Sequence, residues 1–395
     1  MTRTHALPTP YIIMTDQPRY DLFAVCQPGL ERLVADELRS LGIANPRPVV
    51  GGVEFSGFLT HLYRVNLWSR TTERVLLRLR EFRAETFREL HHKAARTAWE
   101  EFLTPGCEVS IRATCRKSRL IHSGGVTERI LSGISDRLGK PSTLVSTDEE
   151  NKSARPNFIV VRVVDDHCQI SLDTSGALLH FRGYRQATAK APLRETLAAA
   201  MILSSGWTSD RSLLDPFCGA GTIPIEAALI ARKIAPGRKR SFAFMDWQKF
   251  DRAEWDALID QADSARLDRA PASVQGSDRD AGAIEASRAN ADRAGVLDDI
   301  EFTERAVSAI EPIGLGHVIT NPPYGVRVGG AGAHSDVRNL YAQFGKVLRA
   351  KCAKWHVAML VGDFQTERST GLKFGPALML SNGGIKVRYV QTDVP

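Results

Sequence analysis

A short apolar strand, a glycine turn and an apolar helix follow one another directly in residues 212–231, SLLDPFCGAGTIPIEAALIA. Leu213 and Leu214 indicate a buried strand that ends at Asp215, and a helical pattern begins after Gly221. Glycines in such a turn let the backbone close tightly and let a ligand lie against it. Strands and helices alternate from this point onward, which is typical of a parallel sheet with helices on both faces.

The residues around this turn narrow the class of ligand. No Lys-Ser/Thr pair follows the second glycine, so the turn is not a P-loop, and Pro224 stands where a dinucleotide fingerprint has its third glycine. Asp215 would repel a pyrophosphate but suits a ligand with an amino group, such as S-adenosylmethionine. After the next strand, Asp278 can accept both hydroxyls of a ribose. The alternative is that Asp278 or Asp280 only caps the following helix.

The segment 318–328, VITNPPYGVRV, ends a run of β-branched residues with two prolines, which cannot donate to a strand ladder. The exocyclic amine of a purine is a poor nucleophile because its lone pair is delocalised into the ring. The side-chain oxygen of Asn321 and the backbone carbonyl of Pro322, held rigid by Pro323, can accept the two amine protons. Tyr324 can stack on the base. We interpret the segment as a clamp for a planar amino group; a strand end with a proline turn is the alternative.

The first half of the chain has a mixed pattern and most of the positive charge. The formal net charge is +7 and the sequence pI is about 9.1. Between Arg70 and Lys140 there are 15 Lys and Arg and 9 Asp and Glu, a surplus that suits a polyanionic partner; a solvated surface with a basic bias explains the charge equally well. The patterns predict an α+β domain with strands over 74–82 and 107–115, helices over 86–103 and 124–140, and a hairpin over 157–176 that turns at Asp165 and Asp166.

Several classes of protein are not indicated. No apolar run approaches the length that spans a bilayer, and the first twenty residues lack the apolar core of a signal peptide, so the expected compartment is the cytoplasm. The six cysteines form no C-x-x-C pair, so we expect free reduced thiols and no bound metal.

Three strings, DPFCGAGT, GSDRD and TNPPYG, resemble class I S-adenosylmethionine-dependent amino methyltransferases in their order and spacing. The strings QPGLERLVADELRSLGI, SGALLHFRGYR and APLRETLAAAMI are similar to bacterial large-subunit rRNA guanine-N2 methyltransferases, and the likeness covers nearly the whole chain. The resemblance implies an α/β, Rossmann-like fold with a seven-stranded sheet. The predicted hairpin over 377–392, turning at Asn382-Gly383-Gly384, would close that sheet in antiparallel fashion.

The resemblance also implies domains and a cofactor site. The implied domains are a disordered tail (1–19), a ferredoxin-like subdomain (20–60), a THUMP RNA-binding domain (61–173), a connector (174–195) and the methyltransferase domain (196–395). The implied residues around S-adenosylmethionine are Pro192, Thr196, Asp215, Phe217, Gly219, Gly221, Thr222, Asp278, Arg279 and Ala306. The family often has Asp where this chain has Ala306, so backbone groups or Glu304 would hold the adenine.

The motif alone leaves three kinds of amine as possible substrates. An N-P-P-Y clamp fits adenine N6 in DNA, guanine N2 in RNA and a glutamine amide, and the basic first half favours structured RNA. The residues expected to contact RNA are Arg116, Lys117, Arg119 and His122, in TCRKSRLIHSGG, with Arg182 and Arg185 of the connector, which could equally pack at the domain junction. The insert over 234–270 resembles the rRNA enzymes, so we expect 23S rRNA, with tRNA second. A non-catalytic RNA-binding assembly factor is the alternative from another class.

Overall fold

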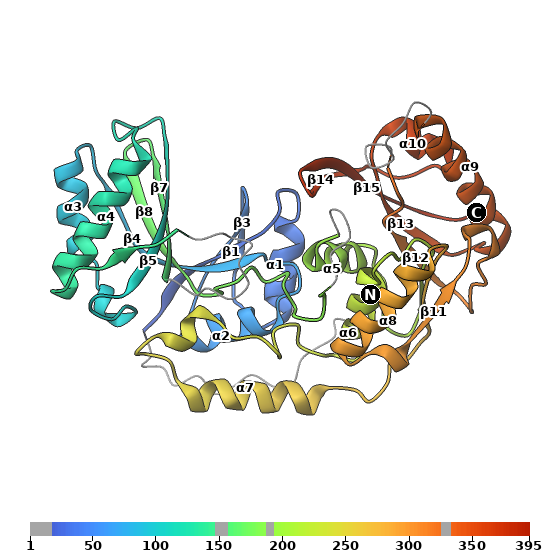
Figure 1. Cartoon of the computed structure of the whole chain (residues 1–395), viewed down its shortest axis with the longest axis horizontal. Coiled ribbons are helices and arrows are strands. Elements are labelled where there is room, and N and C mark those ends of the chain that lie inside the picture. Colours follow the sequence, from blue (N-terminus) through green and yellow to red (C-terminus); the bar gives the residue numbers. More distant parts are fainter. Residues whose placement is uncertain (1–17, 147–156, 187–192, 325–332) are drawn as a thin grey trace. The chain divides into compact units, whose positions relative to one another are not determined.

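The structure is a computed structural model that describes residues 18–146, 157–186, 193–324 and 333–395 (Figure 1). Pro192 and nearly all of the predicted tail lie outside these residues. The chain divides into two compact units. The amino-terminal unit comprises Met1–Cys26, Val34–Leu179 and Lys239–Ile259, and the carboxy-terminal unit comprises Gln27–Leu33, His180–Arg238 and Asp260–Pro395.

The described residues of the amino-terminal unit form an eight-stranded sheet in the order β2-β3-β1-β4-β8-β7-β5-β6. Strand β5 runs parallel to β6 and β7, and the other neighbours are antiparallel. The strands are β1 (Tyr20–Val25), β2 (Arg47–Val49), β3 (Gly52–Gly57), β4 (Arg74–Arg83), β5 (Glu108–Arg116), β6 (Thr143–Leu144), β7 (Asn157–Val164) and β8 (His167–Asp173). The helices that lie wholly or mostly in this unit are α1 (Glu31–Ser40), α2 (Leu59–Trp68), α3 (Phe87–Ala95), α4 (Ser123–Leu138) and α7 (Arg252–Ala265).

Two local predictions for this unit have different outcomes. The predicted hairpin is confirmed, because β7 and β8 are joined by Asp165 and Asp166, whose φ angles of 50° and 64° suit a two-residue turn between twisted strands. The single helix predicted over 86–103 is wrong. Helix α3 ends at Ala95, and a separate 3-10 helix spans Trp99–Glu101. The buried Trp99 indole donates to the carbonyl of Ala94 at 2.8 Å, which occupies an acceptor that a continuous helix would use.

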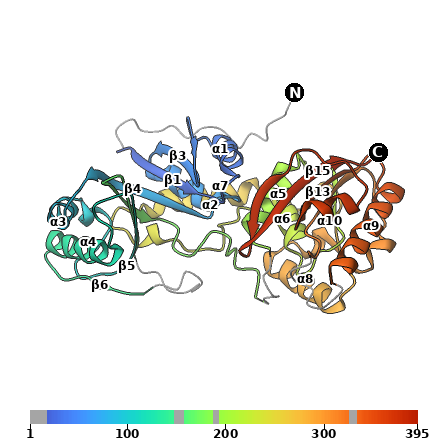
Figure 2. The ribbon, with the colours of Figure 1, turned by 90° about the horizontal axis from the view of Figure 1, so that it is seen from above.

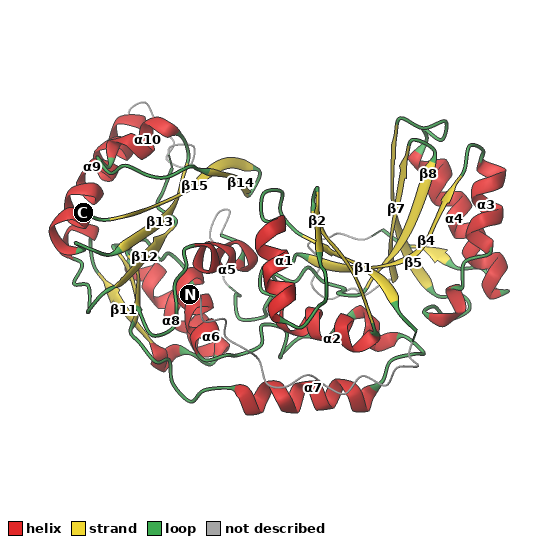
Figure 3. Cartoon of the chain, turned by 180° about the vertical axis from the view of Figure 1, so that it is seen from behind, coloured by secondary structure: helices red, strands yellow, loops and turns green. Residues whose placement is uncertain are grey.

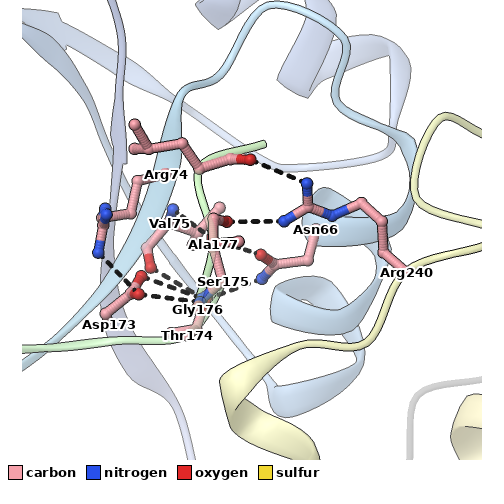
Figure 4. A network of polar contacts seen from close by, with 10 residues as sticks. Asn66, Arg74, Val75, Asp173, Thr174, Ser175, Gly176, Ala177 and Arg240 are labelled. Atoms are coloured by element: carbon pink, nitrogen blue, oxygen red, sulfur yellow. Dashed lines mark hydrogen bonds and ion pairs between the residues drawn. The ribbon is translucent and has the colours of Figure 1, made fainter. Parts of the chain in front are cut away.

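Part of the insert belongs to the amino-terminal unit. The ring of Phe244 stacks on Tyr63 at a centroid distance of 4.6 Å, and Trp255 meets Phe244 edge-on at 5.5 Å. The Arg240 guanidinium donates to the backbone carbonyls of Ala177 and Leu178 at 2.6 and 2.8 Å (Figure 4). Phe244 and Trp255 are therefore core residues, and the segment 239–259 lies outside the unit that contains most of the predicted methyltransferase domain.

A buried polar network fixes the backbone just after β8 (Figure 4). Arg74 pairs with Asp173 at 2.8 Å, and both side chains are buried. Burial raises the pKa of Asp173, while the Arg74 charge opposes that rise. Asn66 donates to the Thr174 hydroxyl at 2.8 Å and accepts from the Ser175 hydroxyl at 2.6 Å. Because the buried side chains satisfy one another, the network specifies one course for the chain as it leaves the sheet.

The described residues of the carboxy-terminal unit form a seven-stranded sheet in the order β11-β10-β9-β12-β13-β15-β14. The first five strands are parallel, and β13, β15 and β14 pair antiparallel. The strands are β9 (Ser212–Asp215), β10 (Val274–Asp278), β11 (Ile300–Glu304), β12 (Gly316–Thr320), β13 (His356–Val361), β14 (Leu378–Asn382) and β15 (Ile385–Asp393). The helices are α5 (Glu195–Ser204), α6 (Thr222–Ala231), α8 (Ala281–Ala294), α9 (Ala333–Lys351) and α10 (Phe364–Ser369).

This sheet is the middle layer of three. Adjacent residues of β12, Val318 and Ile319, point to opposite faces, and both are 0% exposed. Val318 lies in a buried cluster with Tyr341 and Phe344 of α9. Figure 2 and Figure 3 show the sheet with α5 and α6 on one side and α9 on the other. Among the described residues, no helix combines the length and the apolar character that crossing a bilayer requires.

Candidate active site

Three neighbouring strands of the carboxy-terminal sheet end in polar residues that the sequence singled out. Strands β10, β9 and β12 are adjacent and parallel, so their carboxyl ends lie at one edge. Asp278 ends β10, Asp215 ends β9, and Asn321 directly follows β12. In an open α/β sheet, ligands bind at this edge, near the point where the strand order reverses. The strand order therefore brings together three residues that are far apart in the chain, where 106 positions separate Asp215 from Asn321.

Asp215 is a buried carboxylate. It is 2% exposed, and its Oδ1 accepts from the Thr320 hydroxyl at 2.6 Å and from the backbone N–H of Phe217 at 3.1 Å. Burial raises the pKa of Asp215 to about 7, although the two hydrogen bonds oppose the rise. No Lys or Arg pairs with Asp215 among the residues that the structure describes. A buried carboxylate without a cation can accommodate a positively charged group of a ligand.

Asp278 holds the glycine turn instead of capping the next helix. Its Oδ2 accepts from the backbone N–H of Gly219 at 3.0 Å, and its Oδ1 accepts from that of Asp280 at 3.2 Å. The cap of α8 is Asp280, whose side chain accepts from the backbone N–H of Ala283. Each Asp278 oxygen uses one acceptor position in these contacts, and each retains a second position for a hydroxyl group.

Helix α8 fixes the turn from the other side. The buried Ser287 hydroxyl donates to the carbonyl of Gly219 at 2.6 Å, and the Asn290 amide donates to that of Ala220 at 3.0 Å. Gly221 has a φ of 80°, and a Cβ atom at this position would lie 3.0 Å from the Cβ of Ser287. A side chain at position 221 would therefore strain the backbone and displace α8. Ser287 and Asn290 look like ordinary helix residues in sequence, and no local pattern marks them as part of the site.

The clamp residues are connected by hydrogen bonds. The Tyr324 hydroxyl donates to Oδ1 of Asn321 at 3.0 Å and accepts from Nδ2 of Asn382 at 2.6 Å. Pro322 is buried and Pro323 is exposed. Tyr324 is 2% exposed in this structure, and stacking of its ring on a base stays a prediction. Its role here is that of a hydrogen-bonding residue behind Asn321.

The other predicted cofactor residues are distributed along the same unit. Thr196 is buried in α5, and Phe217 is partly buried with an edge-on contact to Phe344 at 5.3 Å. Thr222 is the first residue of α6, and its hydroxyl accepts from Arg185 at 3.3 Å. Helix α6 begins directly after the glycine turn, so its free backbone N–H groups lie next to that turn. The predicted contacts of these residues with a cofactor stay predictions.

The predicted adenine end of the site lies beside β11. Arg279 is exposed between Asp278 and the α8 cap. Ala306 is exposed and precedes the 3-10 helix Val307–Ala309, while Glu304 is the exposed last residue of β11. Glu304 and Ala306 lie at the same sheet edge as Asp278, because β11 is the parallel neighbour of β10. Pro192 lies outside the described residues.

The connector arginines are buried rather than exposed. Nε of Arg182 lies 3.6 Å from Oε1 of Glu226, and both side chains are almost fully buried. Arg185 pairs with Glu195 at 3.1 Å, and the Tyr184 hydroxyl donates to Glu226 at 3.1 Å. Glu195 and Glu226 belong to α5 and α6. The packing alternative therefore accounts for Arg182 and Arg185, which have little surface left to offer RNA.

The predicted phosphate-binding loop is exposed in the amino-terminal unit. Arg116, Lys117, Arg119 and His122 all have exposed side chains, and His122 directly precedes α4. The loop is held by Asp166, which accepts from the backbone N–H of Arg119 at 2.8 Å, and this bond lowers the pKa of Asp166. The arrangement offers positive side chains beside a helix amino terminus, which suits a phosphate group. Contact with RNA stays a prediction.

Comparison with known families identifies the chain. A sequence model of the RMKL-like methyltransferase domain matches residues 182–389. The chain belongs to the RMKL-like methyltransferase family. A second model, for the RlmL ferredoxin-like domain, matches residues 21–76, which extends further than the predicted subdomain 20–60. RMKL-like membership confirms the predicted fold class, and the antiparallel β14–β15 hairpin agrees with it.

Curated relatives of this RMKL-like chain carry names related to RNA methylation. A Synechocystis protein named "Putative RNA methyltransferase slr0064" is 34% identical over 94% of this chain and 96% of its own length. The ribosomal RNA large subunit methyltransferases K/L of Methylococcus capsulatus and Syntrophotalea carbinolica are 36% and 35% identical over 95% and 94% of this chain. The chain spans about half the length of these K/L relatives, at 51% and 53%.

Solved structures share the architecture of the RMKL-like chain. SMU.472, described as "a putative methyltransferase complexed with SAH", is 30% identical with a TM-score of 0.83, and the match covers 94% of this chain and 97% of that one. A Listeria monocytogenes protein described as a "predicted N6-adenine-specific DNA methylase" is 32% identical with a TM-score of 0.86, over 96% and 97%. TrmN from Thermus thermophilus, at 18% identity and a TM-score of 0.71, shares the fold.

Proposed function

We propose that this protein transfers a methyl group from S-adenosylmethionine to the N2 amine of a guanine in 23S rRNA. The observation that carries the proposal is the set of three strand ends, where Asp215, Asp278 and Asn321 meet at one edge beside a glycine turn. The names of the K/L relatives support the rRNA substrate, and the bound SAH of SMU.472 supports the cofactor.

The cofactor fits the groups at this edge. The buried Asp215 carboxylate would hold the ammonium group of S-adenosylmethionine, and the free acceptor positions of Asp278 would hold the ribose hydroxyls. Gly219 and Gly221 let the ligand lie against the backbone. We further propose that Thr196, Phe217, Thr222, Arg279 and Ala306 line the rest of this site, with backbone groups or Glu304 holding the adenine.

The chain's own residues would prepare the amine. Oδ1 of Asn321 and the carbonyl of Pro322 accept the two amine protons, which localises the nitrogen lone pair toward the methyl donor. The cofactor supplies an electrophilic methyl group on a sulfonium, so no strong general base is needed, and positioning provides most of the rate enhancement. A guanine inside a helix must first be flipped out of its stack.

Substrate choice rests on a different part of the chain. We propose that the exposed Arg116–His122 loop grips RNA phosphates and that residues 61–173 form a THUMP domain. A ribosomal substrate would place the reaction in the cytoplasm. The Listeria protein's description names adenine in DNA, an amine that the same clamp accepts, and nucleoside analysis of the product distinguishes the two bases.

The test uses the full chain and its Asn321→Ala variant. We expect the wild type to bind S-adenosylmethionine, seen as a rise in Tm with ligand, and to methylate RNA. The variant should bind the cofactor with nearly unchanged affinity and lose transfer by at least about 100-fold, because one of two proton acceptors is missing. A variant with wild-type turnover would refute the clamp. A wild type whose Tm does not respond to S-adenosylmethionine would favour a non-catalytic RNA-binding assembly factor.

A further inference from the structure

Asn382 ends strand β14 and directly precedes the turn residues Gly383 and Gly384, whose φ angles are 59° and 81°. By sequence it is an ordinary turn asparagine. In the structure it is 1% exposed, and its Nδ2 lies 2.6 Å from the Tyr324 hydroxyl. Its Oδ1 is buried without a hydrogen-bond partner among the described residues. A buried amide with an unsatisfied oxygen costs free energy, so stability alone does not explain it.

The chemistry of the three groups gives the chain of hydrogen bonds a direction. The amide nitrogen of Asn382 can only donate, so the Tyr324 oxygen accepts from it. The single Tyr324 hydrogen is then available for Oδ1 of Asn321, 3.0 Å away. The relay therefore runs from Asn382 through Tyr324 to Asn321.

This direction matters because the two ends of an asparagine amide have nearly the same shape and opposite hydrogen-bonding character. A donor aimed at Asn321 favours the orientation in which the oxygen faces it. One lone pair of Oδ1 then accepts from Tyr324, and the second remains for an incoming amine proton. In the opposite orientation, the NH₂ group of Asn321 would face the substrate NH₂ group, and two donors repel.

We propose that Asn382 is a positioning residue for methyl transfer and that it acts through Tyr324 to hold the oxygen of Asn321 toward the substrate amine. The inference rests on the proposed function. The closing β14–β15 hairpin then has two roles: it forms the edge of the sheet, and it contributes Asn382, the first donor of the relay.

The variants follow from this geometry. Asn382→Asp keeps the shape and, assayed at alkaline pH where the carboxyl is ionised, removes the donor, so the Tyr324 hydrogen turns toward the new carboxylate and Asn321 loses its donor. Tyr324→Phe removes the middle of the relay, and its ring is already buried. Ser381→Ala is the matched control, because Ser381 is the exposed neighbour of Asn382 in β14. Thermal unfolding of each variant checks that it is folded.

Kinetics on RNA give the first readout. We expect Asn382→Asp and Tyr324→Phe each to lower kcat about tenfold, the effect of losing one hydrogen bond of about 1.4 kcal/mol, with KM for RNA and cofactor affinity within about twofold of wild type. The double variant should be no slower than either single variant, because both break the same relay. Single-variant kcat values within twofold of wild type, or multiplicative effects in the double variant, would overturn the proposal.

A second readout does not depend on turnover. In protein labelled with ¹⁵N-asparagine, the Asn321 side-chain amide, assigned through Asn321→Asp, should shift in the same direction in Asn382→Asp and Tyr324→Phe and stay unchanged in Ser381→Ala. If the chemical shift of the Asn321 amide is the same in Asn382→Asp as in wild type, the relay is refuted, even if the wild type methylates nothing. Absence of methylation with an intact relay signal would instead refute only the proposed function.

Discussion

Replacing the buried carboxyl of Asp215 by an amide should stabilise the protein while weakening cofactor binding. Burial raises the pKa of Asp215 from 3.8 to about 7. The folded state therefore retains a proton that the unfolded chain releases near pH 4. Protonation of Asp215 favours folding, and this contribution is lost as the pH rises through the window from about 4 to about 7. Above pH 7 the folded protein carries an uncompensated buried charge.

The size of the effect follows from the shift. Each pKa unit corresponds to about 1.4 kcal/mol, so the full shift amounts to about 4 kcal/mol as an upper value. The amide of Asp215→Asn can still accept from the Thr320 hydroxyl and the Phe217 N–H through Oδ1, so these hydrogen bonds survive. We expect the variant to be more stable than wild type by up to about 4 kcal/mol at pH 8, with a gap that narrows by about 1.4 kcal/mol per unit below pH 7.

Urea unfolding of the cofactor-free wild type and Asp215→Asn at pH 5, 6, 7 and 8 measures this gap. Calorimetric titration with S-adenosylmethionine at pH 8 should show a loss of affinity of at least about tenfold in the variant, since a charge-assisted hydrogen bond to the ammonium group is removed. A gap that does not change with pH would refute the raised pKa of Asp215. Unchanged cofactor affinity would refute its role toward the ammonium group.

Three further predictions test other parts of the molecule. Phe244→Ala should destabilise the protein by about 3–5 kcal/mol in chemical unfolding, while Phe364→Ala, at an exposed ring, should cost less than about 1 kcal/mol; equal losses would contradict the core role of the insert. Lys117→Ala combined with Arg119→Ala should weaken RNA binding and reduce its log–log salt slope by about 1.5, and an unchanged slope would exclude phosphate contact. Gly221→Ala should lower Tm and cofactor affinity together, because the positive φ and the 3.0 Å approach to α8 leave no room for a methyl group; wild-type values of both would contradict the turn geometry.

The sequence predicted the parts of the site that depend on local order. Asp215 ends a short apolar run, Asp278 ends the short segment VQGSD, and each precedes a helical pattern, so their places at strand ends follow from local order. The partners of these residues depend on strand order, which no local pattern contains. Thr320 reaches Asp215 only because β12 lies beside β9. Asn382 reaches Tyr324 only because the closing hairpin folds back on the sheet.

Other differences between expectation and structure have similar causes. The helical period of residues 86–103 hides the break after Ala95, because the competing donor is the indole of Trp99, a side chain. In sequence, Arg182 and Arg185 fit an RNA contact and a packing role equally well, since their buried partners Glu195 and Glu226 lie on helices further along the chain. Charge patterns alone therefore cannot separate an RNA contact from a buried ion pair.

The most direct test of the proposed function is transfer of labelled methyl from S-adenosylmethionine to protein-free 23S rRNA and, in parallel, to bulk tRNA, with nucleoside mass spectrometry of the product. We predict N2-methylguanosine in the rRNA, lost in Asn321→Ala. N2-methylguanosine in tRNA alone would keep the clamp chemistry and contradict the rRNA substrate. N6-methyladenosine, or no methylated nucleoside in either RNA, would contradict the assignment of a guanine-N2 methyltransferase.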